Sequence, residues 1–151
     1  PDSFKLLLMM SITHFMAAYA LGHLGILERE HTGIAGLLPD IDVFMNFMYP
    51  FSHRGITHTL GFGMGAALMT AYLSRDRVEG ISVVSGWISH LLLDSLTSSG
   101  VPWFFPFGKP LALSVTSAND PYWNLSIISL STAFIIYSIN SETLRSLIKS
   151  S

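Results

Sequence analysis

The sequence contains no cysteine, which excludes disulfide bonds and thiolate metal ligands. Charged residues are also scarce: they make up 12% of the 151 residues, against about 25% in a soluble globular domain. The formal net charge of -2 gives no indication of a nucleic-acid partner. No methionine precedes Pro1 and no cleavable signal peptide is evident, so we expect a processed or trimmed product. With a mean hydropathy of +0.48, this shortage of charge favours a membrane protein.

Four apolar stretches have about the length that a helix needs to cross a hydrocarbon core, roughly 20 residues. They are residues 4–21, 58–74, 80–97 and 123–140. The second stretch contains small residues that allow close helix packing: Gly61, Gly63, Gly65, Ala66 and Ala67. We therefore expect one domain over residues 1–151, an all-α integral membrane bundle of about four transmembrane helices. The alternative is a very hydrophobic soluble helical bundle.

Lysine and arginine are distributed unevenly between the two sides that four spans would define. The side with both termini and the 74–80 turn carries Lys5, Arg75, Arg77, Arg145 and Lys149. The other side carries Arg29, Arg54 and Lys109. Because positive charge favours the cytoplasmic side, we expect a multi-pass protein of the inner or plasma membrane with both termini in the cytoplasm.

The polar residues of the apolar regions are mainly histidine and aspartate. They are His14, Asp40, Asp42, His53, His58, His90 and Asp94. Imidazole and carboxylate together are suitable ligands for a divalent metal. His90 and Asp94 stand four residues apart, so one face of a helix presents both. This spacing predicts a metal site near one membrane face.

Several of these residues also have a purely structural interpretation. His14 could be a packed histidine, and His53 and Arg54 could be ordinary loop residues. Asp40 and Asp42 could cap a helix that starts at IDVFMNF. Asp94 is the exception, because a carboxylate inside a span costs several kcal/mol unless it is paired, which makes it a functional candidate.

Four segments resemble the YdjM-like family, described as LexA-regulated, inner-membrane-bound, predicted metal-dependent hydrolases. They are TH at 13–14, LLPDID at 37–42, HRGITHTL at 53–60 and GWISHLLLDSLTSSGVPWFFPF at 86–107. Thr59 stands where the family often has serine. The resemblance implies a helical integral membrane protein with histidine and aspartate metal ligands.

This family is distantly similar to zinc-dependent phospholipase C and the P1-type nucleases. That similarity implies ligand positions for His14, Asp40, His53 or His58, His90 and Asp94. No histidine follows His90, so we expect one or two ions where those enzymes hold three. Zinc is the first expectation, and manganese or iron also suits such ligands.

These observations together predict a phospholipase C-like phosphoesterase acting on a lipid or a membrane-associated phosphoester. A metal-bound water would be the nucleophile, with Asp40 or Asp42 as a ligand or as the base that orients it. Asp94 could bridge two ions, and Arg54 could pair with phosphate oxygens.

Two other classes of function stay open from the sequence. A membrane metalloprotease or amidase could use the same ions, although the chain lacks HExxH. A non-enzymatic metal-binding or transport protein is the second alternative. Transport needs a polar path across the bilayer, whereas the candidate ligands gather toward one side.

Overall fold

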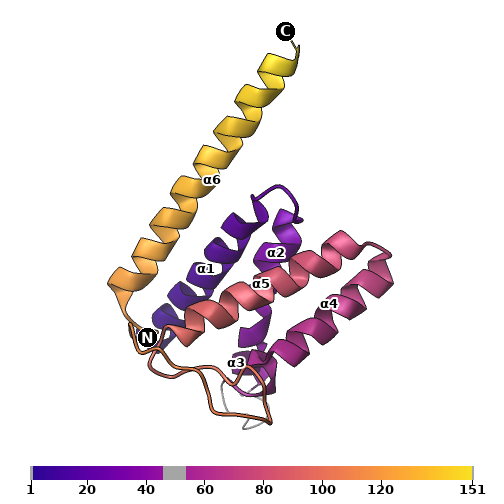
Figure 1. The fold of residues 1–151 in the computed structure, drawn as a ribbon. Helices are drawn as coiled ribbons and strands as arrows, with labels where there is room; N and C mark the ends of the chain where they lie inside the picture. The colour runs from indigo at the N-terminus through magenta and orange to yellow at the C-terminus, as the bar shows by residue number, and fades with distance from the viewer. Residues whose placement is uncertain (1, 46–53, 151) are drawn as a thin grey trace.

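The computed structural model describes residues 2–45 and 54–150, in which every regular element is helical (Figure 1). The α-helices are α1 (Asp2–Gly22), α2 (Arg29–Ala35), α3 (Ile41–Met45), α4 (Leu60–Ser74), α5 (Arg77–Ser95) and α6 (Pro121–Ser150). Two 3-10 turns are η1 (Leu38–Asp40) and η2 (Ile56–His58). The described ranges hold isolated β-bridges but no β-strand. The all-α class is therefore confirmed.

Each expected apolar stretch forms a helix, and polar side chains fix where α4 and α5 begin. The Thr59 hydroxyl accepts a hydrogen bond from the backbone N–H of Phe62 at 3.2 Å, which satisfies a donor that the first turn leaves free. The Asp76 carboxylate caps α5 in the same way, at 2.7 Å from the backbone nitrogen of Val78. His58 therefore precedes α4 instead of lying within it, which moves the expected start of this helix.

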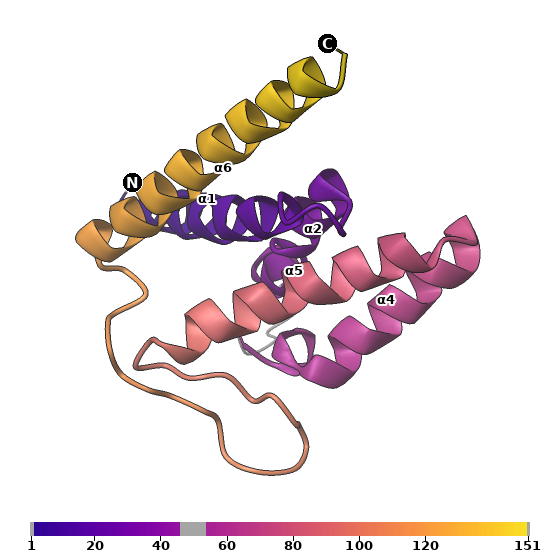
Figure 2. The same cartoon turned by 45° about the horizontal axis from the view of Figure 1, so that its top comes forward.

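Helices α1, α2 and α5 pack against one another, α4 packs against α5, and α6 lies along α1 (Figures 1 and 2). Glycine allows the closest contacts. A Cβ at Gly86 of α5 would lie 2.1 Å from a backbone oxygen of α2, and one at Gly63 of α4 would lie 2.5 Å from the ring of Trp87. At Gly61 and Gly65 a Cβ would meet nothing within 4 Å in the described structure. The small residues of α4 are therefore only partly a packing surface.

Helix α6 contacts the bundle along a narrow line. Asn124, Ser131 and Ser138 are buried at intervals of seven residues, and the Ser138 hydroxyl donates to the backbone oxygen of His23 at 3.3 Å. Most other side chains of α6 are exposed. At about 1.5 Å per residue, its 30 residues give a length of about 45 Å, which exceeds the roughly 30 Å of a hydrocarbon core.

Among the described helices, α6 alone is long and apolar enough to cross a membrane. The apolar segments Leu8–Gly22 of α1 and Leu60–Ser74 of α4 are shorter. Helix α4 has 15 residues, which corresponds to about 22 Å. Of the four transmembrane helices that the sequence predicts, one, α6, therefore has the length and composition of a membrane span. The other three stay predictions.

Helices α1 and α6 run in the same direction through the bundle. In both views α1 begins beside the start of α6, and the two helices run toward the same end of the bundle (Figures 1 and 2). The last residues of α6 mark that far end, so the start of α1 and the end of α6 lie at opposite ends of the bundle. The reason is α2, because this helix of 7 residues and the turns after it return the chain across the bundle without a second long helix. The side of the membrane that each terminus faces stays a prediction.

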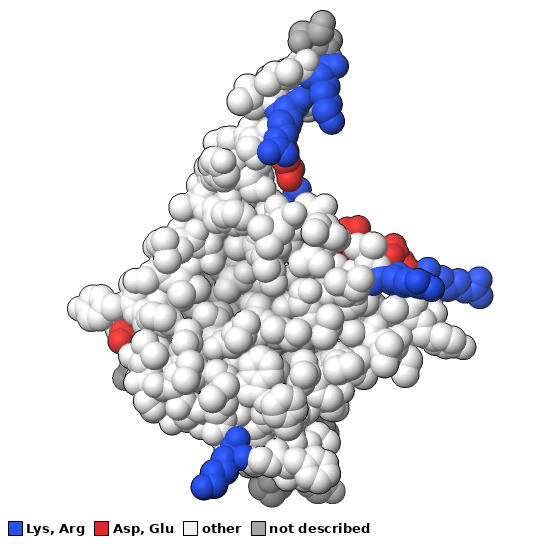
Figure 3. Space-filling model, viewed as in Figure 1, with Lys and Arg blue, Asp and Glu red and all other residues white. Residues whose placement is uncertain are grey.

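The surface carries little charge on the face shown in Figure 3. Charged side chains lie at its edges, and a broad uncharged area separates them. Large apolar side chains of α4 contribute exposed surface to the molecule, among them Leu68, Met69, Tyr72 and Leu73. Such exposed apolar side chains are unfavourable in water and suit contact with an apolar partner such as lipid tails.

Candidate metal centre

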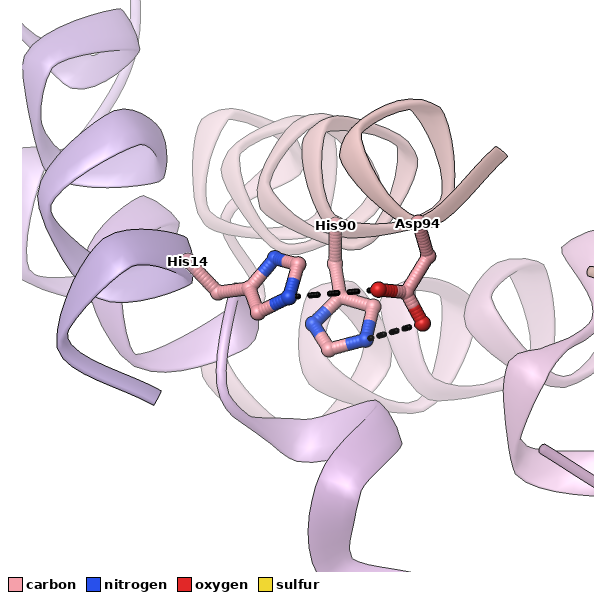
Figure 4. Close-up of side chains that lie close together, drawn as sticks. All are labelled: His14, His90 and Asp94. Atoms are coloured by element: carbon pink, nitrogen blue, oxygen red, sulfur yellow. Dashed lines mark ion pairs between the residues drawn. The ribbon is translucent and has the colours of Figure 1, made fainter. Parts of the chain in front are cut away.

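Helices α1 and α5 bring three of the predicted ligands together in the interior (Figure 4). His90 and Asp94 project from one face of α5, and His14 reaches them from α1; all three are buried. His14 Nε2 lies 3.4 Å from Asp94 Oδ1, and His90 Nε2 lies 3.7 Å from Asp94 Oδ2. The rings of His14 and His90 stack with their centroids 3.9 Å apart.

The two 3-10 turns add Asp40 from η1 and His58 from η2. The two histidine Nε2 atoms, of His58 and His90, lie 3.3 Å apart. Asp40 Oδ1 lies 3.6 Å from the first of them and 3.7 Å from the second. Bonds of about 2.0–2.1 Å to a tetrahedral zinc separate neighbouring ligand atoms by roughly 3.3–3.4 Å. These three atoms therefore have nearly the spacing of one face of a metal tetrahedron.

Asp94 lies between this triangle and His14. Its Oδ2 is 3.7 Å from the Nε2 atoms of both His58 and His90. The described residues thus hold two groups able to bind an ion, His14–His90–Asp94 and Asp40–His58–His90. His90 belongs to both groups, but its Nδ1 is used by Gly36 and its Nε2 has a single lone pair, so His90 can bind one ion. A second ion would have to be held mainly by His14 and Asp94.

The outer nitrogen of each central histidine is held by a second partner. His90 Nδ1 donates to the backbone oxygen of Gly36 at 2.8 Å. His58 Nδ1 lies 3.3 Å from Asp42 Oδ2 and 3.2 Å from the hydroxyl of Thr57. Such partners fix the tautomer and direct the other nitrogen toward a metal. Asp42 therefore lies behind His58, away from the converging Nε2 atoms.

Two polar atoms of the cluster lack a hydrogen-bond partner among the described residues. They are Asp40 Oδ2 and His14 Nδ1, and both are buried. A buried polar atom without a partner costs about 1–3 kcal/mol and is rare in native structures. A cation bound at Asp40 would supply the missing interaction, so the residues present fit a metal ion.

The charge of the cluster points to the same conclusion. Within the described part of the chain, Asp40, Asp42 and Asp94 are three buried carboxylates. The one guanidinium among them is that of Arg54, with a side chain 9% exposed. With neutral histidines, three negative charges against one positive leave two negative charges uncompensated. Buried charge of this kind is strongly unfavourable, and one divalent cation would balance it.

The carboxylates also shift the protonation of the turn residues. Burial by itself would lower the pKa of His58, but Asp40 and Asp42 outweigh burial and raise the pKa of His58 to about 9. Burial would raise the pKa of Asp40, yet its hydrogen bond with His58 and the nearby His90 and His14 lower it. Without a metal, the positive charge of protonated His58 therefore neutralises part of the negative charge of the carboxylates.

Arg54 is fixed at the edge of the cluster. Its backbone has a φ of +63°, and its backbone N–H donates to Asp42 Oδ2 at 2.9 Å. The guanidinium lies 3.1 Å from Asp94 Oδ1 and donates to the Thr97 hydroxyl at 2.9 Å and to the Gly100 carbonyl at 3.2 Å. Asp40 thus contacts His58, and Asp42 contacts both His58 and Arg54. Both aspartates therefore have interactions beyond helix capping.

The remaining sequence predictions differ in outcome. His53 lies outside the described residues. No spacing in the sequence distinguishes Asn124 from its polar neighbours Asn119 and Asp120, whereas the structure selects Asn124. Asn124 lines a hollow of about 10 Å³ together with Thr13, His14, Asp94 and Thr97, and such a volume has room for about one water.

Comparison with known proteins identifies a family and several relatives of the chain. Residues 9–148 match the family described as YdjM inner membrane protein. The inner membrane protein YdjM of Escherichia coli K12 is 37% identical over 90 residues, which are 46% of this chain and 44% of that protein. The protein of the same name from Shigella flexneri gives the same values. The chain therefore spans less than half the length of these two relatives.

A further relative is matched over a longer region. The inner membrane protein YbcI of Escherichia coli K12 is 34% identical over 122 residues, which are 64% of this chain and 69% of that protein. No solved structure matches the chain. Because the family match extends over nearly all of the sequence and includes every described residue of the cluster, the chain belongs to the YdjM family of inner membrane proteins.

Proposed function

We propose that the protein is a metal-dependent hydrolase of the inner membrane, a phosphoesterase acting on a lipid or a membrane-associated phosphoester. One observation carries this proposal. The Nε2 atoms of His58 and His90 and the Oδ1 atom of Asp40 converge within 3.3–3.7 Å of one another, while Gly36 and Asp42 occupy the opposite sides of the two rings.

These residues would hold one or two zinc-like ions. Asp40, His58 and His90 form one ligand group, and His14 and Asp94 extend it. A bound ion of this kind lowers the pKa of a water molecule toward neutrality and so supplies a hydroxide nucleophile. The hollow beside His14 and Asp94 has room for a water molecule, and the carboxylate of Asp94 can accept a hydrogen bond from it and so orient it.

The other polar residues position these groups. Asp42 holds the ring of His58, and Arg54 holds Asp94 through an ion pair of 3.1 Å. A guanidinium has five N–H donors in a planar fork. Arg54 can therefore contact a phosphate oxygen while its bonds to Thr97 and Gly100 keep it in place.

The position of the cluster suits chemistry near a membrane surface. His90 and Asp94 lie in the last two turns of α5, and His58 precedes the first residue of α4. With α6 as one span and α1, α4 and α5 as shorter or tilted spans, the cluster would lie toward one face of a multi-pass bundle. Headgroups of lipids are found at that level of a bilayer.

A metal site without hydrolysis is the second candidate, and burial favours it. The side chains of His58 and His90 are 0% exposed, and closed sites of this kind are typical of structural metals. Hydrolysis separates the two proposals. The full chain in detergent, loaded with zinc or manganese, should release product from a phospholipid or a chromogenic phosphodiester and leave peptides intact.

The variant Asp40→Asn tests the residue assignment in the same assay. It should lower the rate at least tenfold, because it weakens a ligand that binds through its negative charge. Asp76→Asn is the matched control, since asparagine caps a helix as well as aspartate and Asp76 lies at the other end of α5. Metal binding without turnover of any phosphoester would favour the structural site.

A further inference from the structure

An apolar cavity lies directly beside the metal centre, between α4, α5 and the two 3-10 turns. Its volume is about 410 Å³, within the range of roughly 300–1,000 Å³ that small-molecule sites occupy. Its wall is almost wholly hydrocarbon and is formed by Leu38, Ile41, Ile56, Phe62, Ala66 and Trp87. The polar residues of the lining are Asp42 and Thr57.

The polar residues connect this cavity to the proposed catalytic groups. Asp42 and Thr57 both contact Nδ1 of His58, at 3.3 and 3.2 Å. One wall of the cavity is therefore the outer side of a proposed metal ligand. Only the ring of His58 and its two polar partners lie between the cavity and the converging Nε2 atoms.

The opposite side of the cavity opens at the surface of the protein. Ile41, Ile56 and Phe62 belong to its wall and are 44–57% exposed. The neighbouring outer face of α4 is also apolar, with Met64 and Leu68 exposed. Such a mouth communicates with lipid tails when the protein is in a membrane, because the one charged residue among the described lining, Asp42, is buried on the side of His58.

We infer that this cavity binds one hydrocarbon chain of a lipid substrate, entering sideways from the bilayer, while its phosphoester group lies at the metal centre. The inference rests on the proposed function for the identity of that group. A peptide fits poorly, because a wall this apolar leaves backbone N–H and C=O groups without partners. A soluble phosphoester has no apolar part to fill the space. The substrate class is therefore a phosphoester with a long alkyl, acyl or isoprenoid chain.

Small residues of α4 set the space available for the chain. Ala66 lies in the wall, and a larger side chain there would occupy the cavity. Gly63, one turn earlier, lets the ring of Trp87 pack closely against α4. Ala66 is therefore the residue expected to determine which chain lengths are accepted.

Fluorescence quenching tests the inference without requiring hydrolysis. The full chain with Trp103→Phe and Trp123→Phe keeps Trp87 as its single tryptophan, which is buried and lines the cavity. This protein is titrated in unbrominated dodecylmaltoside micelles with a phospholipid whose acyl chains carry bromine. We expect saturable quenching of at least twofold. An unbrominated long-chain phospholipid should reverse it, and a dibutyryl phospholipid should not.

Two substitutions locate the bound chain. Ala66→Leu, which fills the wall, and Ile41→Phe, which narrows the mouth, should each weaken quenching at least fivefold. Ala133→Leu on the exposed surface of α6 is the matched control and should behave as the parent. Unquenched Trp87, or equal reversal by short and long chains, would overturn the inference, as would full quenching in both cavity variants. Quenching without any hydrolysis would instead uphold the lipid site and contradict the proposed reaction.

Discussion

The Nε2 atoms of His58 and His90 face each other at 3.3 Å in the interior of the bundle. His90 uses its Nδ1 hydrogen for the carbonyl of Gly36, and His58 turns its Nδ1 toward the carboxylate of Asp42. In neutral rings, both facing Nε2 atoms then carry lone pairs, which repel each other unless a cation or a proton lies between them. This relationship is the strongest structural argument for a metal.

The contact between His58 and Asp42 gives the first prediction. Asp42→Asn keeps the size of the side chain and removes the charge that orients and polarises His58. Loss of such an outer partner typically lowers metal affinity about 10- to 100-fold, and titration with zinc against a competing chelator measures it. Asp76→Asn should leave the affinity as it is in the parent protein. Equal affinities for Asp42→Asn and the parent would show that Asp42 does not support the site.

The pairing of Arg54 with Asp94 predicts a large effect on stability. Both side chains are less than 10% exposed, so Arg54→Gln would leave a buried carboxylate without its partner. We expect the metal-free protein to lose about 3–5 kcal/mol of unfolding free energy, measured by denaturant titration in detergent. The comparison is Arg29→Gln, which removes the ion pair with Glu142 on the surface. Exposed pairs contribute about 0–1 kcal/mol, and similar losses in both variants would contradict the buried pair.

Close helix packing at Gly86 gives a third prediction. In Gly86→Ala the new Cβ would meet the backbone oxygen of Thr32 at 2.1 Å, and backbone cannot move aside as a flexible side chain can. We expect a loss of about 1–3 kcal/mol and a lower midpoint in thermal unfolding. Gly65→Ala should instead be neutral or stabilise α4 by up to about 1 kcal/mol, since nothing lies within 4 Å of its Cβ in the described structure.

The raised pKa of His58 makes metal-free stability depend on pH. The folded pKa is about 9 and the reference value is 6.5, so protonation of His58 stabilises the fold below pH 6.5. That contribution declines as the pH rises from 6.5 through about 9. Thermal unfolding of chelator-treated protein should therefore show a falling midpoint across this window, and His58→Gln should remove the fall. Zinc affinity should rise over the same window, because the ion displaces the proton. An affinity independent of pH would contradict displacement at His58.

The sequence predicted the cluster better than it predicted the path of the chain. His14, Asp40, His58, His90 and Asp94 stand out because histidine and aspartate are rare in apolar segments, and the structure brings all five together. The four apolar stretches predicted four helices correctly, because each is long and continuous enough to form one. The short helix α2 went unnoticed, since its seven residues carry no long apolar pattern.

Other parts of the site had no signal in residue type. The carbonyl of Gly36 holds His90, and any residue has a backbone carbonyl. Thr97 binds Arg54 from 43 positions away, a distance at which no spacing rule operates. Asp42 looked equivalent to Asp40 in the sequence, and only the turn geometry separates the residue behind His58 from the one beside the converging nitrogens.

Metal content of the purified protein tests the central claim most directly. Elemental analysis of the full chain in detergent, beside a His90→Ala/Asp94→Ala double variant, should find one or two transition-metal ions per chain in the parent protein. The double variant, folded to the same helix content, should bind none. A parent protein that stays free of metal after incubation with zinc and manganese would contradict the account, and the buried histidines and aspartates would then form a proton-linked hydrogen-bond network.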